Sequence, residues 1–306
     1  MFIFYKLFVF IMYPRPFDYF SPKNLAEALD LLQSSCDAMK ILAGGQSLIP
    51  LMKLRTFSPV SVVDITGVKE LNYIRKEKNT LKIGALTTTS IIESDLKIGF
   101  SFPILEETAS QVADPLVRNL GTIGGNLCHA DPANDWPAPM LALNASFEIA
   151  SKQGTRIVHS DSFFLARFKT VLKPNEVLTE IQIPIQSRRV GSSYRKVKKG
   201  SGGFTIAGVA THVLVTDDNT VSECRIAMTA VGPKPLRAEK AEQQLIGKSF
   251  EPSTLDNIAK LAVEASMPVT DINASERYRR KALSMLVKDS LGVSYKRAVM
   301  SGYGKD

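Results

Sequence analysis

The chain has 306 residues, 44% hydrophobic and 22% charged, so it can bury a sizeable core, and it fits neither a disordered chain nor a polytopic membrane protein. Its 38 Lys and Arg against 30 Asp and Glu give a net charge of +8, but the basic residues are spread out, which argues against a nucleic-acid partner. Three cysteines without a C-x-x-C pair argue against a disulfide framework and suit a reducing cytoplasm.

The first segment, MFIFYKLFVFIMY, is strongly apolar but shorter than the roughly 20 residues that a membrane-spanning helix needs. Tyr13-Pro14-Arg15-Pro16 follows it, without a small-residue cleavage site, so a signal peptide is not expected either. Met12 offers a second start. Residues 1–11 are therefore set apart as an N-terminal extension without a structural assignment, and no membrane span is expected.

The next residues predict a mixed α/β unit. Ser21-Pro22 is a helix start signal, and Leu25, Ala28 and Leu29 follow on one helical face. A strand over 40–42 leads into a glycine loop and a helix over 47–53. Further strands are predicted over 60–65 and 80–85, and a helix over 103–112 that ends before Asp114-Pro115.

A strand over 181–185 alternates at period two, and its Pro184 indicates an edge strand or a strand end. The polar stretch after it suggests a domain boundary, with one domain over 12–186 and a second over 187–306. In the second domain, strands over 205–215 and 222–230 flank the turn Asp217-Asp218-Asn219, and helices follow, one of them over 276–287. The predicted class is α+β.

Two glycine-rich loops are the strongest candidates for a functional site: Ala43-Gly44-Gly45-Gln46-Ser47 and Gly121-Thr122-Ile123-Gly124-Gly125-Asn126. Glycine lets successive backbone N–H groups converge on an anion, and a following helix N-terminus adds a partial positive charge. Two such loops suit the pyrophosphate of a dinucleotide. A pair of tight turns without a ligand is an equally weighted alternative.

The common nucleotide and hydrolase motifs are absent from the sequence. It contains no G-x-x-x-x-G-K-[ST] and no G-x-G-x-x-G after a first strand, which excludes the usual kinase and Rossmann patterns. The first loop lacks the last glycine of a nucleophile elbow, and the three histidines have no evident Asp partner. Cys128-His129 is adjacent along the chain, a spacing that rarely chelates one ion, so no metal site is expected.

Several runs together resemble the FAD-binding medium subunit of molybdenum hydroxylases, the carbon monoxide, aldehyde and xanthine dehydrogenase complexes. The resemblance rests mainly on ILAGGQSLIPLMK at 41–53 and GTIGGNLCHADPANDWP at 121–137. It extends over nearly the whole chain after Met12, through FDYFSPKNLAEAL, VVDIT, LKIGALTT, YRKVKK and TDINASERYRRKAL.

The resemblance implies an FAD-binding domain similar to the vanillyl-alcohol-oxidase (PCMH) type, with two α/β subdomains, followed by a smaller α+β domain. It implies that both loops cradle the FAD pyrophosphate and that further residues lie near the ribityl chain and ring. The cofactor-binding residues expected on this basis are Ala43, Gly44, Gly45, Gln46, Ser47, Thr122, Ile123, Gly124, Gly125, Asn126, Asp135 and Lys198.

Some of these assignments have plain structural alternatives. Asp135 could instead cap a helix before Trp136-Pro137. Arg195, Lys196, Lys198 and Lys199 are candidates to stabilise reduced flavin, but a solvated loop is favoured for most of them. Phe204 could cover the flavin ring, although a core position is the commoner explanation.

The resemblance also implies partners: a large molybdenum–pterin subunit that oxidises substrate and a small subunit with [2Fe–2S] clusters, in a cytoplasmic complex expected to be a dimer of heterotrimers. No catalytic residue is expected in this chain itself. An aldehyde is the favoured substrate of the complex, followed by carbon monoxide and purines. Two other classes stay open, a self-contained PCMH-type flavin oxidase and a non-catalytic interaction module of the same fold.

Overall fold

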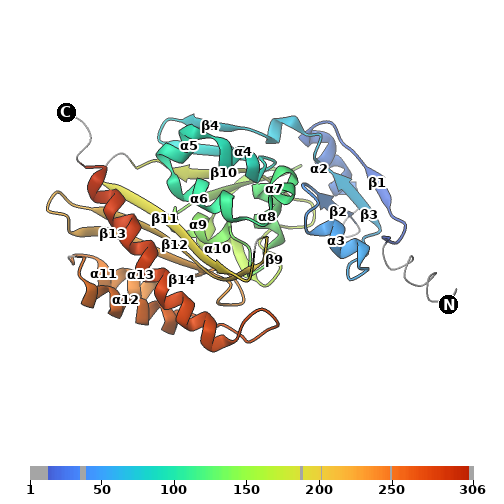
Figure 1. Cartoon of the computed structure of the whole chain (residues 1–306). Helices are drawn as coiled ribbons and strands as arrows, with labels where there is room; N and C mark the ends of the chain where they lie inside the picture. The colour runs from blue at the N-terminus through green and yellow to red at the C-terminus, as the bar shows by residue number, and fades with distance from the viewer. Residues whose placement is uncertain (1–12, 35–38, 187–188, 201, 249, 303–306) are drawn as a thin grey trace.

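A computed structural model describes residues 13–34, 39–186, 189–200, 202–248 and 250–302 of the chain. The predicted extension over 1–11 lies outside these residues. The fold combines three main sheets with helices, which confirms the predicted α+β class (Figure 1). None of the described helices is long and apolar enough to cross a membrane.

A small parallel sheet stands at one end of the molecule (Figure 1). Its order is β1-β3-β2, and helix α2 contacts β3. Because all pairings are parallel, the carboxyl ends of these strands meet at one edge, where the chain continues into loops and short helices. The bounds are β1 Asp18–Phe20, α2 Leu25–Ser34, β2 Met39–Leu42, α3 Leu48–Lys53, β3 Ser61–Asp64 and the 3₁₀ helix η1 Lys69–Leu71.

A five-stranded antiparallel sheet forms the middle of the molecule, in the order β4-β5-β10-β6-β7. β10 is its central strand, so the edge position suggested by Pro184 is wrong. The other prediction, a strand end, is correct, because Pro184 is the last residue of β10. A proline at a strand end does not interrupt the hydrogen bonds of the strand interior. The bounds are β4 Ile74–Glu77, β5 Thr80–Gly84, β6 Ser146–Ser151, β7 Gly154–His159 and β10 Val177–Pro184, with a side hairpin of β8 Phe164–Ala166 and β9 Lys169–Thr170.

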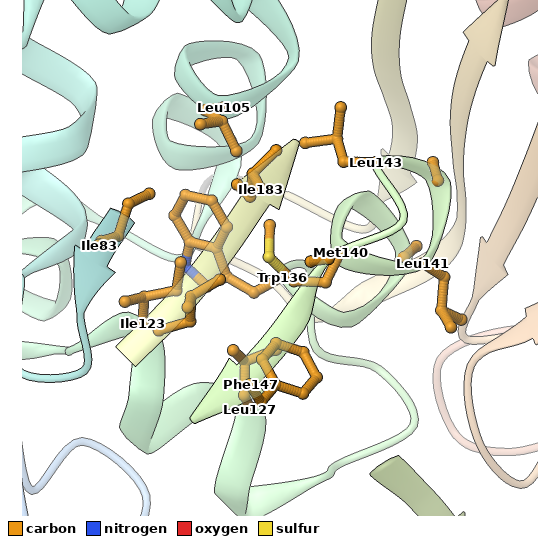
Figure 2. Packing of buried hydrophobic residues seen from close by; sticks show 14 of the residues in the cluster. Ile83, Leu105, Ile123, Leu127, Trp136, Met140, Leu141, Leu143, Phe147 and Ile183 are labelled. Atoms are coloured by element: carbon orange, nitrogen blue, oxygen red, sulfur yellow. The ribbon is translucent and has the colours of Figure 1, made fainter. Parts of the chain in front are cut away.

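Short helices enclose the core of this middle region. The fully buried Trp136 ring lies among Ile83, Ile123 and Ile183, so helix α8 and strands β5 and β10 share one apolar layer (Figure 2). The bounds are α4 Thr89–Ser94, α5 Leu96–Ser101, α6 Pro103–Gln111, α7 Pro115–Leu120, α8 Ile123–His129, α9 Pro137–Ala142 and α10 Ser160–Phe163.

The C-terminal region is an antiparallel sheet, β11-β12-β13-β14, with three helices. Helix α13 runs across β11 and β12 (Figure 1). It spans Glu276–Met300, much longer than the predicted 276–287. The bounds are β11 Val190–Lys198, β12 Thr205–Val215, β13 Val221–Thr229, β14 Leu236–Arg237, α11 Glu239–Leu245, α12 Pro252–Ala265 and α13 Glu276–Met300.

The middle and C-terminal regions share one hydrophobic cluster. Tyr194, Ala210 and Ala227, from β11, β12 and β13, are fully buried in the same core as Trp136. The sheet of the C-terminal region therefore completes the core of the region that precedes it.

Candidate functional site

The first glycine loop connects β2 to α3 and carries free backbone donors. Gly45 has a φ of +72°, in the left-handed region that favours glycine. Gly44 has no room for a side chain, since a Cβ there would lie 2.1 Å from the Leu120 carbonyl oxygen. Among the described residues, the N–H groups of residues 44–47 have no hydrogen-bond acceptor. Unbonded N–H groups in a glycine loop can hold an anion.

The second glycine loop has a different role from the first. The sequence predicts free N–H groups in both loops, but here the N–H of Ile123 donates to Thr87 O at 3.0 Å and that of Gly124 to Ala85 O at 2.9 Å. The Gly125 N–H donates to Thr122 Oγ1 at 3.1 Å, as in an ordinary helix cap. The physical reason is that α8 begins inside the loop and docks on the end of β5.

Gly124 is required for that docking. A Cβ at Gly124 would lie 2.6 Å from both the Cβ and the carbonyl oxygen of Ala85. Its φ is not positive, so the constraint is close packing rather than backbone conformation. The second loop is thus a packed support. Its side chains, rather than its N–H groups, remain available to contact a ligand.

The two loops touch each other although nearly eighty residues separate them. A Cβ at Gly125 would be 3.5 Å from the Ala43 Cβ, and one at Gly121 would be 3.6 Å from Gln46 Cγ. The structure therefore brings both predicted motifs to one place, at the carboxyl edge of the parallel sheet. Ligands in open α/β sheets bind at this edge.

Asn126 provides a direct test of whether a polar ligand fits here. Its side-chain carbonyl oxygen is buried and has no hydrogen-bond partner within the described residues. Buried polar atoms are normally satisfied, so an orphan acceptor beside the loops calls for a donor such as a ligand hydroxyl. The free N–H groups of 44–47 and this acceptor together fit a ligand that carries both phosphates and hydroxyl groups. FAD is such a ligand.

Asp135 lies at the centre of a buried polar cluster. Its carboxylate accepts hydrogen bonds from Tyr194 Oη at 2.6 Å and Thr205 Oγ1 at 2.8 Å. Lys196 Nζ lies 2.8 Å from both carboxylate oxygens, and the lysine side chain is only 1% exposed. The helix-cap alternative for Asp135 is wrong, because the N-cap of α9 is Trp136, without a side-chain cap.

Burial sets the electrostatics of this cluster. It lowers the pKa of Lys196, and the Asp135 carboxylate opposes that shift. Burial and the same carboxylate raise the pKa of Tyr194 well above its usual value. The cluster is connected to the second loop through the neighbouring residue, because Asn134 Nδ2 donates to the backbone carbonyl oxygen of Asn126 at 2.8 Å.

Arg195, Lys196 and Lys198 lie in strand β11, so the solvated loop favoured from the sequence for most of the basic run is wrong for these three. Lys199 follows the strand and is exposed, as that alternative expected. Arg195 contacts Glu107 at 3.0 Å and Asp289 at 3.1 Å, while Lys196 points to Asp135. Lys198 ends the strand half-buried, with no bonded partner in the described part of the chain. It stays close enough to lower the pKa of Lys196.

Phe204 is 67% exposed, so the core position favoured from the sequence is wrong. It follows the end of β11 on the loop before β12 and is open to solvent. Sequence reasoning also missed two members of the Asp135 cluster, Tyr194 and Thr205. The available signal was the i, i+2 spacing of Tyr194 and Lys196, which places both on one face of a strand.

Cys128 and His129 are the last two residues of α8. Burial raises the pKa of the Cys128 thiol to about 12. The His129 ring packs against Phe168, with the ring centroids 5.2 Å apart. Within the described residues no group of three or more His, Cys, Asp or Glu side chains is arranged to hold a metal ion.

Comparisons with known proteins agree with this geometry. Residues 15–186 match the family described as "FAD binding domain in molybdopterin dehydrogenase", and residues 192–292 match "CO dehydrogenase flavoprotein C-terminal domain". The chain belongs to this family of FAD-binding medium subunits of molybdenum hydroxylases.

Individual relatives span nearly the whole chain. The carbon monoxide dehydrogenase medium chain of Hydrogenophaga pseudoflava is 38% identical over 286 residues, 94% of this chain and 99% of that one. The glyceraldehyde dehydrogenase medium chain of Sulfolobus acidocaldarius is 36% identical, over 90% of this chain and 97% of that one. A solved carbon monoxide dehydrogenase from H. pseudoflava, which lacks the Mo-pyranopterin moiety, superposes with a TM-score of 0.91 at 39% identity, over 94% of this chain and 99% of that one.

Proposed function

We propose that this chain is the FAD-binding electron-transfer subunit of a heteromeric molybdenum hydroxylase. The observation that carries the proposal is the contact between the two glycine loops, with free N–H groups over 44–47 and the orphan acceptor of Asn126 beside them. When bound, FAD supplies the exchange between single-electron and two-electron transfer, and the protein binds and tunes it.

In this proposal each predicted site residue has a role that follows from its place. The N–H groups of Gly44, Gly45, Gln46 and Ser47 hold the pyrophosphate, with Ala43 packed behind them. The support segment Thr122, Ile123, Gly124 and Gly125 fixes the position of that loop, and Asn126 accepts a hydroxyl. Asp135 and Lys196 set the electrostatic field at the ribityl and ring end, and Lys198 adds a positive charge there.

The partners belong to the proposal too. We infer a large molybdenum–pterin subunit and a small [2Fe–2S] subunit, assembled as a dimer of heterotrimers in the cytoplasm. Cys128 and Cys224 are free thiols, which suits a reducing compartment. The aldehyde preference stays a prediction, since relatives named for carbon monoxide and for glyceraldehyde have nearly equal identity to this chain.

The first test is flavin analysis of the complex purified with its partners. We expect about one FAD per copy of this chain. FMN, or no flavin, released from the denatured complex would contradict the proposal.

The second test is kinetic. The full complex should pass electrons from substrate to a two-electron acceptor, and the complex without this chain should reduce its clusters and then stop unless a one-electron dye is added. Steady turnover of an aldehyde by this chain alone, free of molybdenum, would instead favour the self-contained oxidase.

A further inference from the structure

One stretch of the sequence, TDINASERYRRKAL over residues 270–283, has no role in the site described so far. It forms the loop before helix α13 and the first turns of that helix. Arg279 lies in its helical part, and only 4% of this residue is exposed. Because a guanidinium is always charged, burying it is costly unless its N–H groups find acceptors. The contacts of Arg279 therefore decide what it does here.

The guanidinium of Arg279 joins three segments of the C-terminal region. Its Nη1 donates to the backbone carbonyl oxygens of Ile206, at 2.5 Å, and of Ala230, at 3.0 Å. Its Nη2 donates to the carboxylate of Asp271, at 2.7 Å, in the loop before α13. Arg279 thus ties the start of β12 and the residue after β13 to helix α13.

The two carbonyl groups lie where strands β12 and β13 separate. The pairing of these strands ends at Gly208 and Thr229, so Ile206 and Ala230 lie beyond the last pair. Ala230 has a φ of +62°, which is a strained conformation for a residue other than glycine. Because the ladder between the two strands has ended, Arg279 supplies the link between them at this point.

The start of β12 carries a hydroxyl of the Asp135 cluster. Thr205 is the residue before Ile206, and its Oγ1 donates to the Asp135 carboxylate at 2.8 Å. Lys196 Nζ lies 3.4 Å from the same hydroxyl oxygen. A shift in the start of β12 would therefore move a group that contacts both charged members of the cluster.

The end of β13 holds the other side of the cluster. Thr229 Oγ1 donates to the Asn134 carbonyl oxygen at 2.6 Å and lies 2.9 Å from that of Pro132. The N–H of Ala230 donates to the Pro132 carbonyl oxygen at 2.8 Å. These bonds fix the segment that leads into Asp135, so both strand ends joined by Arg279 hold the same cluster.

We propose that Arg279 is a positioning residue for the flavin, which acts through Thr205 and Thr229 rather than by binding the cofactor. It fixes the two strand ends and with them the places of Asp135 and Lys196. The proposal rests on the proposed function, in which this pair lies at the ribityl and ring end, and extends that site to helix α13. Arginine suits the task because its planar fork bonds several acceptors in fixed directions.

The FAD affinity of the complex tests this role. The complex is purified with its partners, stripped of flavin and titrated with FAD, and the dissociation constant is measured by flavin fluorescence. Arg279→Met should raise this constant about tenfold, because it removes three hydrogen bonds and releases both strand ends. The visible circular dichroism of the bound flavin should change too, because the charged groups at the ring end move. Arg279→Lys keeps the charge but not the fork, and should weaken binding by a smaller factor.

Arg237→Met is the matched control. Arg237 is another largely buried guanidinium of the C-terminal region, and it forms ion pairs with Asp161 and Glu242, which are not members of the Asp135 cluster. Its loss should lower the melting temperature of the flavin-free complex, as Arg279→Met does. It should change the dissociation constant for FAD less than twofold and leave the circular dichroism of the flavin unchanged.

A double-mutant cycle separates positioning from a general loss of stability. Thr205→Ala removes one of the two hydroxyls through which Arg279 acts. In that background Arg279→Met should weaken FAD binding by a smaller factor than it does in the unmodified chain. Arg237→Met should have the same small effect in both backgrounds.

The outcomes distinguish this proposal from the proposed function. If the unmodified complex binds no FAD, the proposed function fails, and this proposal fails with it. If it binds FAD but both Arg279 variants keep the unmodified affinity, the positioning role is overturned while FAD binding stands. Equal losses in Arg279→Met and Arg237→Met, or the same loss with and without Thr205→Ala, would overturn it in the same way. Arg279→Lys takes the place of Arg279→Met in each comparison should the latter not fold.

Discussion

Gly45 combines a φ of +72° with a place in the row of free N–H groups, so its effect on ligand binding can be separated from its effect on stability. Replacing it by alanine forces a Cβ into the left-handed region, at a cost of about 1–2 kcal/mol. The strain is relieved if the loop shifts, and a shifted loop misdirects its N–H groups.

We therefore expect Gly45→Ala to raise the dissociation constant for FAD at least tenfold, measured by flavin fluorescence. Gly247→Ala is a matched control, because Gly247 has a φ of +75°, with nothing within 4 Å of the added Cβ, and lies in a turn after α11. It should show the same backbone strain, without the 2.6 Å contact that the Gly45 Cβ would make with Ile49 Cδ1, and keep its FAD affinity. Equal FAD affinity in both variants would show that the first loop is not the anion site.

The Asp135–Lys196 pair makes a second prediction at the scale of single residues. Removing one partner of a buried ion pair leaves the other charge uncompensated, which costs about 3–5 kcal/mol. Lys196→Met should lower the free energy of unfolding by about that amount in urea titrations at pH 7, although Tyr194 and Thr205 still donate to the carboxylate.

The double variant Asp135→Asn/Lys196→Met should recover much of this loss, because a neutral amide oxygen still accepts the two hydroxyl donors. The coupling between the two positions is the decisive quantity. Additive single losses, with no recovery in the double variant, would mean that the pair does not interact as the structure describes.

At the scale of elements, the glycine loops could be predicted because their signal is local. Each is a short run of small and polar residues between regular elements, and the consequence for backbone geometry follows from glycine itself. The different roles of the two loops could not be predicted in this way. They depend on Ala85 and Thr87, which lie nearly forty residues before the second loop. The backbone carbonyl oxygens of these two residues accept hydrogen bonds from the N–H groups of that loop.

Helix α13 was predicted correctly at its start, but its predicted end at residue 287 is wrong. Its first half has the apolar spacing that predicts a helix, and the buried face of its second half mixes Leu291 and Ala298 with the polar residues Ser290 and Ser294. Ser290 and Ser294 both hydrogen-bond with Thr211 Oγ1, at 2.8 and 2.7 Å, so polar side chains occupy the buried face. Leu291 and Ala298 continue the apolar stripe at helical spacing, so the prediction ended this helix too early.

The tight packing of β11 against α13 gives a prediction about these elements. A Cβ on Gly191 would lie 1.9 Å from the Ser294 carbonyl oxygen, so Gly191→Ala must push strand and helix apart. Overpacking of this kind costs about 1–3 kcal/mol, and we expect a matching fall in the melting temperature.

Gly292→Ala, on α13 itself, is the control. Nothing lies within 4 Å of its added Cβ, and alanine is the better helix former by about 1 kcal/mol, so this variant should gain stability. A Gly191→Ala variant as stable as the wild type would show that the two elements pack less closely than described.

At the scale of the whole molecule, the shared core makes the predicted boundary after residue 186 a poor place to divide the protein. Tyr194, Ala210 and Ala227 would be missing from a fragment of residues 13–186, leaving Trp136 and its neighbours beside open apolar space. We expect this fragment to lack a cooperative thermal transition in calorimetry, and to regain one when extended to residue 302. A cooperative transition in the shorter fragment would contradict a shared core.

The same feature orders events during synthesis. Domains commonly fold from the N-terminus as they leave the ribosome, at about 5–20 residues per second. The cluster around Trp136 is complete only when Ala227 has been synthesised. At those rates Ala227 follows residue 186 after an interval on the order of 2–8 seconds. During that interval the nascent chain exposes apolar surface that later strands cover, so it is then that chaperones have most to protect.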